Sequence, residues 1–297
     1  MPPRVEALHE KVLRRARRLV PPTAFRAIQK RLRERHGIEI GGPSAVFRRW
    51  NLWPLYPVVG ALDNYNFAPQ TIWSESKPTA HNLGIITQSA PRGRHLIGEA
   101  TLMNDIQSST YEFLLASHVL EHIANPLRAL HTWRRVIGPD ATIVLVVPHR
   151  DGTFDHRRPV TSLDHILNDF ANDVAETDDT HLNEILQLHD LSHDAGAGPR
   201  DAFVKRAANN IRYRSLHHHV FDTELLLKLV DKAGLRILYL DLELPYHICV
   251  ACSSRSGADR SCDNDSATQH AASWTPDAEW RRTSPFPSDR RLGSGAT

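Results

Sequence analysis

The fold is decided by residues 111–122, YEFLLASHVLEH. The first half is a short apolar run, which predicts a buried strand over Tyr111–Ala116. A helical pattern follows over Pro126–Val136, and a second apolar run covers Thr142–Val147. The apolar face of that helix holds Leu127, Leu130, Trp133 and Val136. Strand, helix and strand in this order predict a βαβ unit, which requires a parallel sheet.

The same alternation extends in both directions along the chain. A second helix is expected from Thr223 to Lys232, with Asp222 as its N-cap and Gly234 at its end. The remaining expected strands are Ile38–Ile40, Tyr56–Leu62, His95–Ile97, Leu235–Leu240 and His247–Ala251. We therefore predict an α/β fold, a Rossmann-like, doubly wound and mostly parallel sheet of seven strands.

Changes in pattern divide the chain into four parts. Residues 1–36 form a basic helical arm, which either packs its apolar stripe on the domain or makes peripheral contact with an anionic membrane. Residues 37–252 form the α/β domain. Within it, residues 149–219 are a long His-rich insertion or lid, helical over Leu163–Phe170 and His181–Leu188. Residues 253–297 lack periodicity and are expected to be a disordered tail.

Composition narrows the class of protein. The 41% hydrophobic content is enough for a full core, and the net charge of +2 gives no clear sign of nucleic-acid binding. Three cysteines cannot form a disulfide framework, which favours a reducing compartment. No apolar stretch approaches the roughly 20 residues of a membrane span. A cytoplasmic protein is the expectation.

Acidic residues lie near the expected ends of three successive strands. Glu39 precedes Gly41 and Gly42, and glycine there lets a backbone turn sharply beside a ligand. Asp63 comes about 20 residues later, the spacing at which doubly wound folds place an acid on a ribose. Glu99 follows the third strand. Together they predict a nucleotide-like ligand at the carboxyl edge of the sheet.

Residues 111–122 resemble the "fD-vv-s-hvLEH" segment of class I S-adenosylmethionine (SAM) methyltransferases. Asn125-Pro126, residues 133–136 and the strand ending at Pro148 continue the resemblance in the same order, and it covers residues 39–252. It implies SAM as the cofactor. By this resemblance the methionine portion is wrapped by the loop with Glu39, Gly41 and Gly42, the ribose is bound by Asp63, the adenine is contacted by Glu99, and the pocket is closed by the turn at His118.

Two positions depart from the pattern of the family. Pro43 stands where the loop after the first strand has its second glycine, and Pro139-Asp140-Ala141 replaces the usual Pro-Gly-Gly before the fifth strand. Both could reshape the cofactor pocket. A catalytically silent relative is therefore a standing alternative.

The insertion supplies the candidate catalytic groups. His149, Asp155 and His156 follow the fifth strand directly, where imidazoles suit a general base. Substrate-binding candidates are Arg157 and Arg158, for an anionic substituent, and His217, His218 and His219, if that segment returns to the same edge. His118 with His122, and Cys249 with Cys252, show metal-like spacing, but we expect neither pair to bind a metal.

These observations predict a SAM-dependent methyltransferase that acts on a hydroxyl or amine of a small-molecule or glycan-like acceptor. Two alternatives stay open. One is a metal-binding enzyme or module that uses the His/Asp cluster on a degenerate methyltransferase scaffold. The other is a non-catalytic scaffold protein with the same fold.

Overall fold

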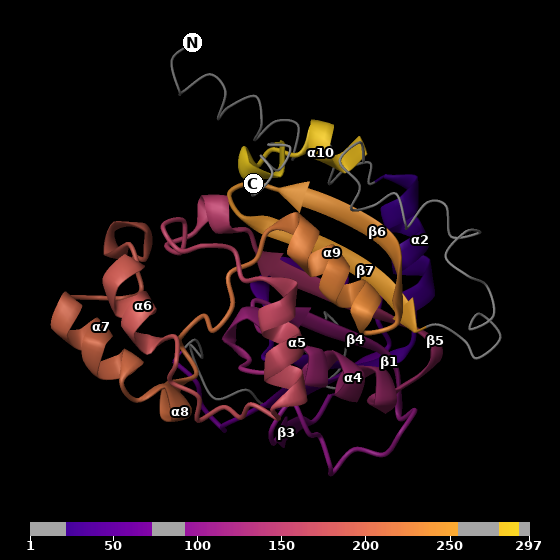
Figure 1. Ribbon diagram of the computed structural model, residues 1–297. Coiled ribbons are helices and arrows are strands. Elements are labelled where there is room, and N and C mark those ends of the chain that lie inside the picture. Colours follow the sequence, from indigo (N-terminus) through magenta and orange to yellow (C-terminus); the bar gives the residue numbers. More distant parts are fainter. Residues whose placement is uncertain (1–21, 73–92, 255–278, 291–297) are drawn as a thin grey trace.

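The computed structural model describes residues 22–72, 93–254 and 279–290. Its centre is a sheet of seven strands in the order β3-β2-β1-β4-β5-β7-β6 (Figure 1). The first five strands are parallel to one another, and β7 is antiparallel to both β5 and β6. This confirms the predicted doubly wound, mostly parallel sheet.

The strands are β1 (His36–Ile40), β2 (Ala61–Asn66), β3 (His95–Ile97), β4 (Tyr111–Ser117), β5 (Ile137–Pro148), β6 (Leu235–Glu243) and β7 (His247–Ser254). The α-helices are α2 (Thr23–Leu32), α4 (Pro126–Val136), α5 (Leu163–Ala171), α6 (Leu182–Leu188), α7 (Arg200–Ala207), α8 (Asn210–Tyr213), α9 (Thr223–Lys232) and α10 (Glu279–Thr283). Short 3-10 turns include η1 (Ala45–Phe47), η2 (Leu120–His122) and η7 (Ser288–Arg290).

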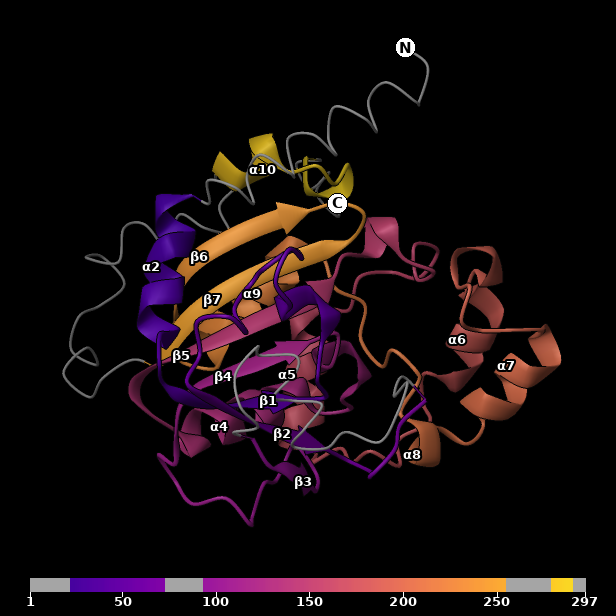
Figure 2. The same ribbon diagram turned by 180° about the vertical axis from the view of Figure 1, so that it is seen from behind.

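Helices cover both faces of the sheet (Figures 1 and 2). On one face α4, α5 and α9 bury their apolar stripes, and Trp133 of α4 is fully buried there. On the other face α2 packs through Phe25, Ile28 and Leu32, beside Trp53 of the segment that follows η1. Amphipathic helices are stabilised mainly by this burial. Residues 23–32 of the predicted arm thus pack on the domain, whereas residues 1–21 lie outside the described part.

The insertion forms a separate small lobe beside the sheet, where α6, α7 and α8 gather (Figure 1). Its own core contains Ile185, Phe203 and Leu216. The two helices predicted in the insertion are confirmed as α5 and α6. The insertion returns to the sheet through residues 214–221, which lead into α9.

Two sequence-based boundaries are wrong. The strand predicted over Tyr56–Leu62 lies later, at Ala61–Asn66, because Tyr56 and its neighbours pack as a loop over the α2 face. The tail predicted to be disordered is ordered over residues 279–290. Phe286 and Asp289 are buried there and contact His149. These contacts offset the entropy lost when the segment is ordered, although its polar composition predicted disorder.

Across the described ranges, no helix is both long enough and apolar enough to cross a bilayer.

Candidate functional site

The loop after β1 turns sharply at the carboxyl edge of the sheet. Gly41 has a φ of +75°, and a Cβ there would approach Val119 to 2.5 Å. A Cβ on Gly42 would lie 2.2 Å from the carboxyl carbon of Glu39. Gly41 therefore needs glycine for its left-handed backbone and its close approach to Val119, and Gly42 needs it for its close approach to Glu39. The loop lies directly against the segment that follows β4.

The Glu39 side chain packs against this loop at Gly42 and Ser44. Its carboxylate is fully buried and accepts hydrogen bonds from the Tyr56 hydroxyl at 2.6 Å and from the Ser44 backbone N–H at 3.0 Å. Burial raises the pKa of Glu39 to about 7, against the lowering effect of these hydrogen bonds and of Arg48. The sequence-predicted residues Glu39, Gly41 and Gly42 are thus brought together in one turn.

Asp63 lies inside β2 rather than after it. Its carboxylate accepts hydrogen bonds from the Arg94 guanidinium at 2.7 Å and from the Tyr111 hydroxyl at 2.8 Å. Despite burial, these partners lower the pKa of Asp63. The strand end belongs instead to Asn66, whose side-chain amide donates to the Gly42 carbonyl at 2.9 Å. A ribose role was predicted for Asp63 because the second strand was placed too early in the sequence. The residue at the end of that strand is Asn66.

Glu99 follows β3 by two residues, as predicted. It accepts a hydrogen bond from Arg214 at 2.9 Å and one from the Thr101 hydroxyl at 3.3 Å. Gly98 makes another close approach, since a Cβ there would meet the Tyr65 hydroxyl at 2.0 Å. The contact with Arg214 joins the insertion to this corner of the sheet.

His118 directly follows β4, has a φ of 53° and keeps 31% of its side chain exposed. Its Nε2 is 3.1 Å from Nδ1 of His247, and its Nδ1 is 3.6 Å from Oε1 of Glu121. Glu121 is buried, and neither carboxylate oxygen has a hydrogen-bond partner among the described residues. Burial opposes its ionisation, but His118, His122 and His217 outweigh this effect and lower the pKa of Glu121. His118 and His122 lie around a turn, not on one face of a helix.

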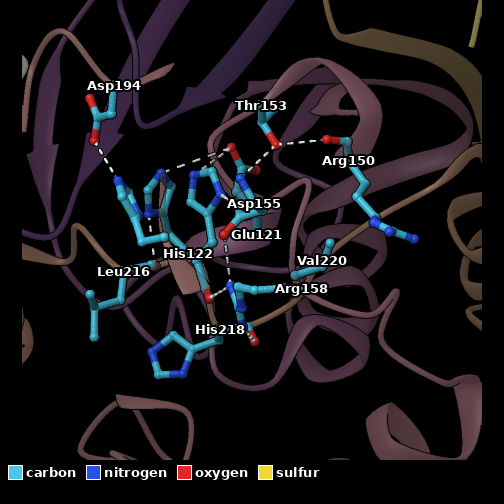
Figure 3. Close-up of polar contacts among 12 residues, drawn as sticks. Glu121, His122, Arg150, Thr153, Asp155, Arg158, Asp194, Leu216, His218 and Val220 are labelled. Atoms are coloured by element: carbon cyan, nitrogen blue, oxygen red, sulfur yellow. Dashed lines mark hydrogen bonds and ion pairs between the residues drawn. The ribbon is translucent and has the colours of Figure 1, made fainter. Parts of the chain in front are cut away.

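Behind this turn lies a buried ion pair (Figure 3). Arg158 is 1% exposed and donates to Asp155 at 3.0 Å, to Glu184 at 2.7 Å and to the His217 carbonyl at 2.8 Å. Asp155 lies 2.5 Å from Nδ1 of His217. Burial disfavours the Asp155 carboxylate, yet His217 and Arg158 lower its pKa to about 2. Arg158 is therefore a structural cation, and the prediction that it binds substrate is wrong because no part of it reaches solvent.

The catalytic role predicted for His149 is also wrong on geometry. Its side chain is fully buried, stacks on Phe286 with ring centroids 3.9 Å apart, and lies 3.1 Å from Asp289. A base sealed behind the C-terminal segment cannot reach a substrate. His156 and Arg157 are partly exposed, but both face Asp190, at 3.5 and 2.7 Å.

The three consecutive histidines do not converge. His217 faces Asp155, Nε2 of His218 lies 3.2 Å from the Asn210 side-chain amide, and Nε2 of His219 lies 3.2 Å from the Ala124 carbonyl. All three are buried. The expectation that they bind substrate together is therefore wrong, although His217 approaches Glu121 to 3.9 Å.

Two residues of this site escaped the sequence analysis. Asn66 was missed because the second strand was placed five residues too early. Glu121 was not predicted as a site residue. An acid close to His118 and His122 at the end of a strand is nevertheless a signal for a charged site. Three features therefore lie along the carboxyl edge of the sheet. They are the glycine turn, the polar groups at the ends of β2 and β3, and the partly exposed imidazole of His118 beside the Glu121 carboxylate.

A known family of proteins matches this chain. A family model described as "Methyltransferase domain" matches residues 60–240, which is more than half of the chain. No curated protein matches the sequence.

Solved structures with similar folds include a SAM-dependent methyltransferase from Aquifex aeolicus, 13% identical with a TM-score of 0.42, where the match covers 82% of this chain and 96% of that one. A 1,6-didemethyltoxoflavin-N1-methyltransferase from Burkholderia thailandensis, with bound 1,6-didemethyltoxoflavin and S-adenosylhomocysteine, is 10% identical with a TM-score of 0.44, and the match covers 80% and 81%.

Proposed function

We propose that this chain, which belongs to the methyltransferase domain family, methylates a hydroxyl or amine of a small-molecule or glycan-like acceptor. Its cofactor is SAM, the methyl donor of the class I fold. The observation that carries the acceptor-side proposal is the position of His118, partly exposed and directly preceding Val119, against which Gly41 packs. A base and the cofactor loop are thereby neighbours.

The residues at this edge fit the cofactor. The turn at Gly41 and Gly42 has no space for side chains, so its backbone can approach a ligand closely. Asn66 and Glu99 offer carbonyl and carboxylate oxygens, which are acceptors for ribose hydroxyls and an adenine amino group. Pro43 follows the two essential glycines without displacing either. These features support Gly41, Gly42, Asn66 and Glu99 as the residues that would hold SAM.

The bound cofactor supplies an activated methyl group on a sulfonium, so the protein has to orient the acceptor and accept its proton. We assign the base to His118. When the methyl group is transferred, the His118 imidazole would accept the proton that the acceptor hydroxyl or amine loses. Oε1 of Glu121 lies 3.6 Å from Nδ1 of His118, where its negative charge would stabilise the imidazolium.

The surroundings of His118 favour a polar acceptor. His247 and the ring of Tyr246 lie beside it, with the His118 and Tyr246 ring centroids 5.6 Å apart. An aromatic face next to hydrogen-bonding nitrogens suits sugars and polar ring compounds. Arg157, which is half exposed near the surface of the insertion, stays a proposed contact for an anionic substituent.

The test uses SAM with a labelled methyl group and a panel of hydroxyl- and amine-bearing small molecules and monosaccharides. With an acceptor found, His118→Asn should lower turnover by about 10²–10⁴ while cofactor affinity stays unchanged. The control is Arg35→Ala, because Arg35 directly precedes β1 and so lies at the amino end of the strand, away from the carboxyl edge. Full turnover in His118→Asn would refute the assignment of the base, and no transfer to any class in the panel would refute the choice of acceptor.

We also propose a cytoplasmic location and peripheral contact with anionic membranes through the basic residues of segment 1–21. Sedimentation with vesicles that contain phosphatidylserine checks the contact. Equal recovery with neutral vesicles would contradict it.

A further inference from the structure

Three histidines and an aspartate meet in the insertion, away from His118. His165 and Asp169 are four residues apart on α5 and therefore share one face of that helix. His181 is the residue before α6, and His219 belongs to the segment before α9. One ring nitrogen from each of the three histidines lies within 4.8 Å of the other two.

We propose that His165, Asp169, His181 and His219 form a binding site for a single Zn²⁺ ion. The site does not depend on the methyl-transfer proposal, because its residues differ from those assigned to cofactor and acceptor.

The distances suit a tetrahedral ion. Nε2 of His165 is 3.1 Å from Nε2 of His181 and 3.3 Å from Oδ2 of Asp169. Four ligands at zinc bond lengths of about 2.0–2.1 Å are separated from one another by roughly 3.3 Å. These two observed separations are close to this value.

Hydrogen bonds alone do not satisfy this group. Nε2 of His165 carries at most one proton, yet it faces both an imidazole nitrogen and a carboxylate oxygen. Oδ2 of Asp169 and Nδ1 of His219 are buried without a hydrogen-bond partner among the described residues. Buried polar atoms without partners are costly, and a cation would satisfy both oxygen and nitrogen lone pairs at once.

The second ring nitrogen of His219 supports the same conclusion. Its Nε2 lies 3.2 Å from the Ala124 carbonyl, which favours a proton on Nε2 and leaves a lone pair on Nδ1. Histidines that bind metals usually donate their other N–H to a carbonyl or carboxylate in this way. His165 is partly exposed, so an ion can enter from solvent.

Three imidazoles and one carboxylate would give the ion four protein ligands, and four-coordinate tetrahedral geometry is typical of structural zinc. Such an ion would tie α5 and the start of α6 to the segment that carries His217. The backbone N–H of His219 donates to the Glu121 carbonyl at 3.3 Å, so the zinc would also fix the insertion against the turn after β4.

The experiment uses the full chain without a polyhistidine tag, stripped with EDTA and titrated with ZnCl₂ by calorimetry, with metal content measured by mass spectrometry. We expect one Zn²⁺ per chain, and at least about tenfold weaker binding in His165→Ala and in His181→Ala. His36→Ala is the matched control, because His36 is a partly exposed histidine at the start of β1 and, among the described residues, belongs to no cluster of potential metal ligands.

No stoichiometric zinc, or an equal loss of affinity in His36→Ala, would overturn the proposal. If the ligand variants do not fold, Co²⁺ bound to the wild-type chain decides the matter. The strong visible bands of tetrahedral Co²⁺ would support the site, and the weak spectrum of hydrated Co²⁺ alone would overturn it.

Discussion

Glu39→Gln tests the role of the buried carboxyl under the glycine turn. The pKa of Glu39 rises from 4.5 to about 7 because of burial, and each pH unit in that interval corresponds to about 1.4 kcal/mol. Ionising Glu39 in the folded protein therefore costs about 3 kcal/mol relative to the unfolded chain.

The sign follows from proton binding. Below pH 4.5 the carboxyl is protonated in both states. Between pH 4.5 and 7 the folded state keeps a proton that the unfolded state releases, so the stability that this group contributes is lost as the pH rises through 7. Glutamine is neutral throughout and can still accept one hydrogen bond from Ser44 or Tyr56, so its variant should lack this component.

Urea unfolding of both proteins, followed by circular dichroism at fixed pH values from 4.5 to 8, measures the effect. The unfolding free energy of the wild type should fall by about 3 kcal/mol relative to Glu39→Gln across that range. Parallel curves for the two proteins would show that Glu39 is not held protonated by burial, and the account of the turn would be wrong.

Two further substitutions test the structural contacts around the site. Phe286→Ala should lower the unfolding free energy by about 3 kcal/mol, as for other buried aromatic residues, because Phe286 covers His149; an unchanged Tm would mean that residues 279–290 are not docked. Arg158→Met should cost about 3–5 kcal/mol, because it removes the guanidinium that pairs with the buried Asp155 carboxylate and leaves only His217 beside it, whereas the half-exposed Arg157→Met should cost less than about 1 kcal/mol. Equal effects of the two arginine variants in chemical denaturation would contradict the structural role of Arg158.

The sequence predicted the sheet well where apolar runs were bounded by clear signals. The helix at Pro126–Val136 has Asn125 as an N-cap and a proline in its first turn, and its predicted limits are confirmed. The strand at Tyr56–Leu62 failed because Trp53, Leu55, Tyr56 and Val59 are equally apolar in a loop that covers the α2 face. The pattern of apolar residues indicates which side chains are buried, and a buried loop gives the same pattern as a strand.

The candidate site was predictable at the positions that depend on backbone geometry. Gly41, Gly42 and Glu99 lie where the sequence suggested. The histidines were not predictable, because their roles depend on which segments meet across the insertion. His149 is sealed by Phe286, some 140 residues later, and His219 points toward α5 instead of toward His217. The i, i+4 pair of His165 and Asp169 on a predicted helix was the available signal for a metal site, and it was overlooked.

Calorimetric titration with S-adenosylhomocysteine, the demethylated product of SAM, tests most directly whether the carboxyl edge of the sheet holds the cofactor. We expect one binding site per chain, with affinity weakened by about 1–3 kcal/mol in each of Asn66→Ala and Glu99→Ala. Glu112→Gln, at the amino end of β4, should bind as tightly as the wild type. Absence of binding, or wild-type affinity in both Asn66→Ala and Glu99→Ala with their folds intact, would contradict it.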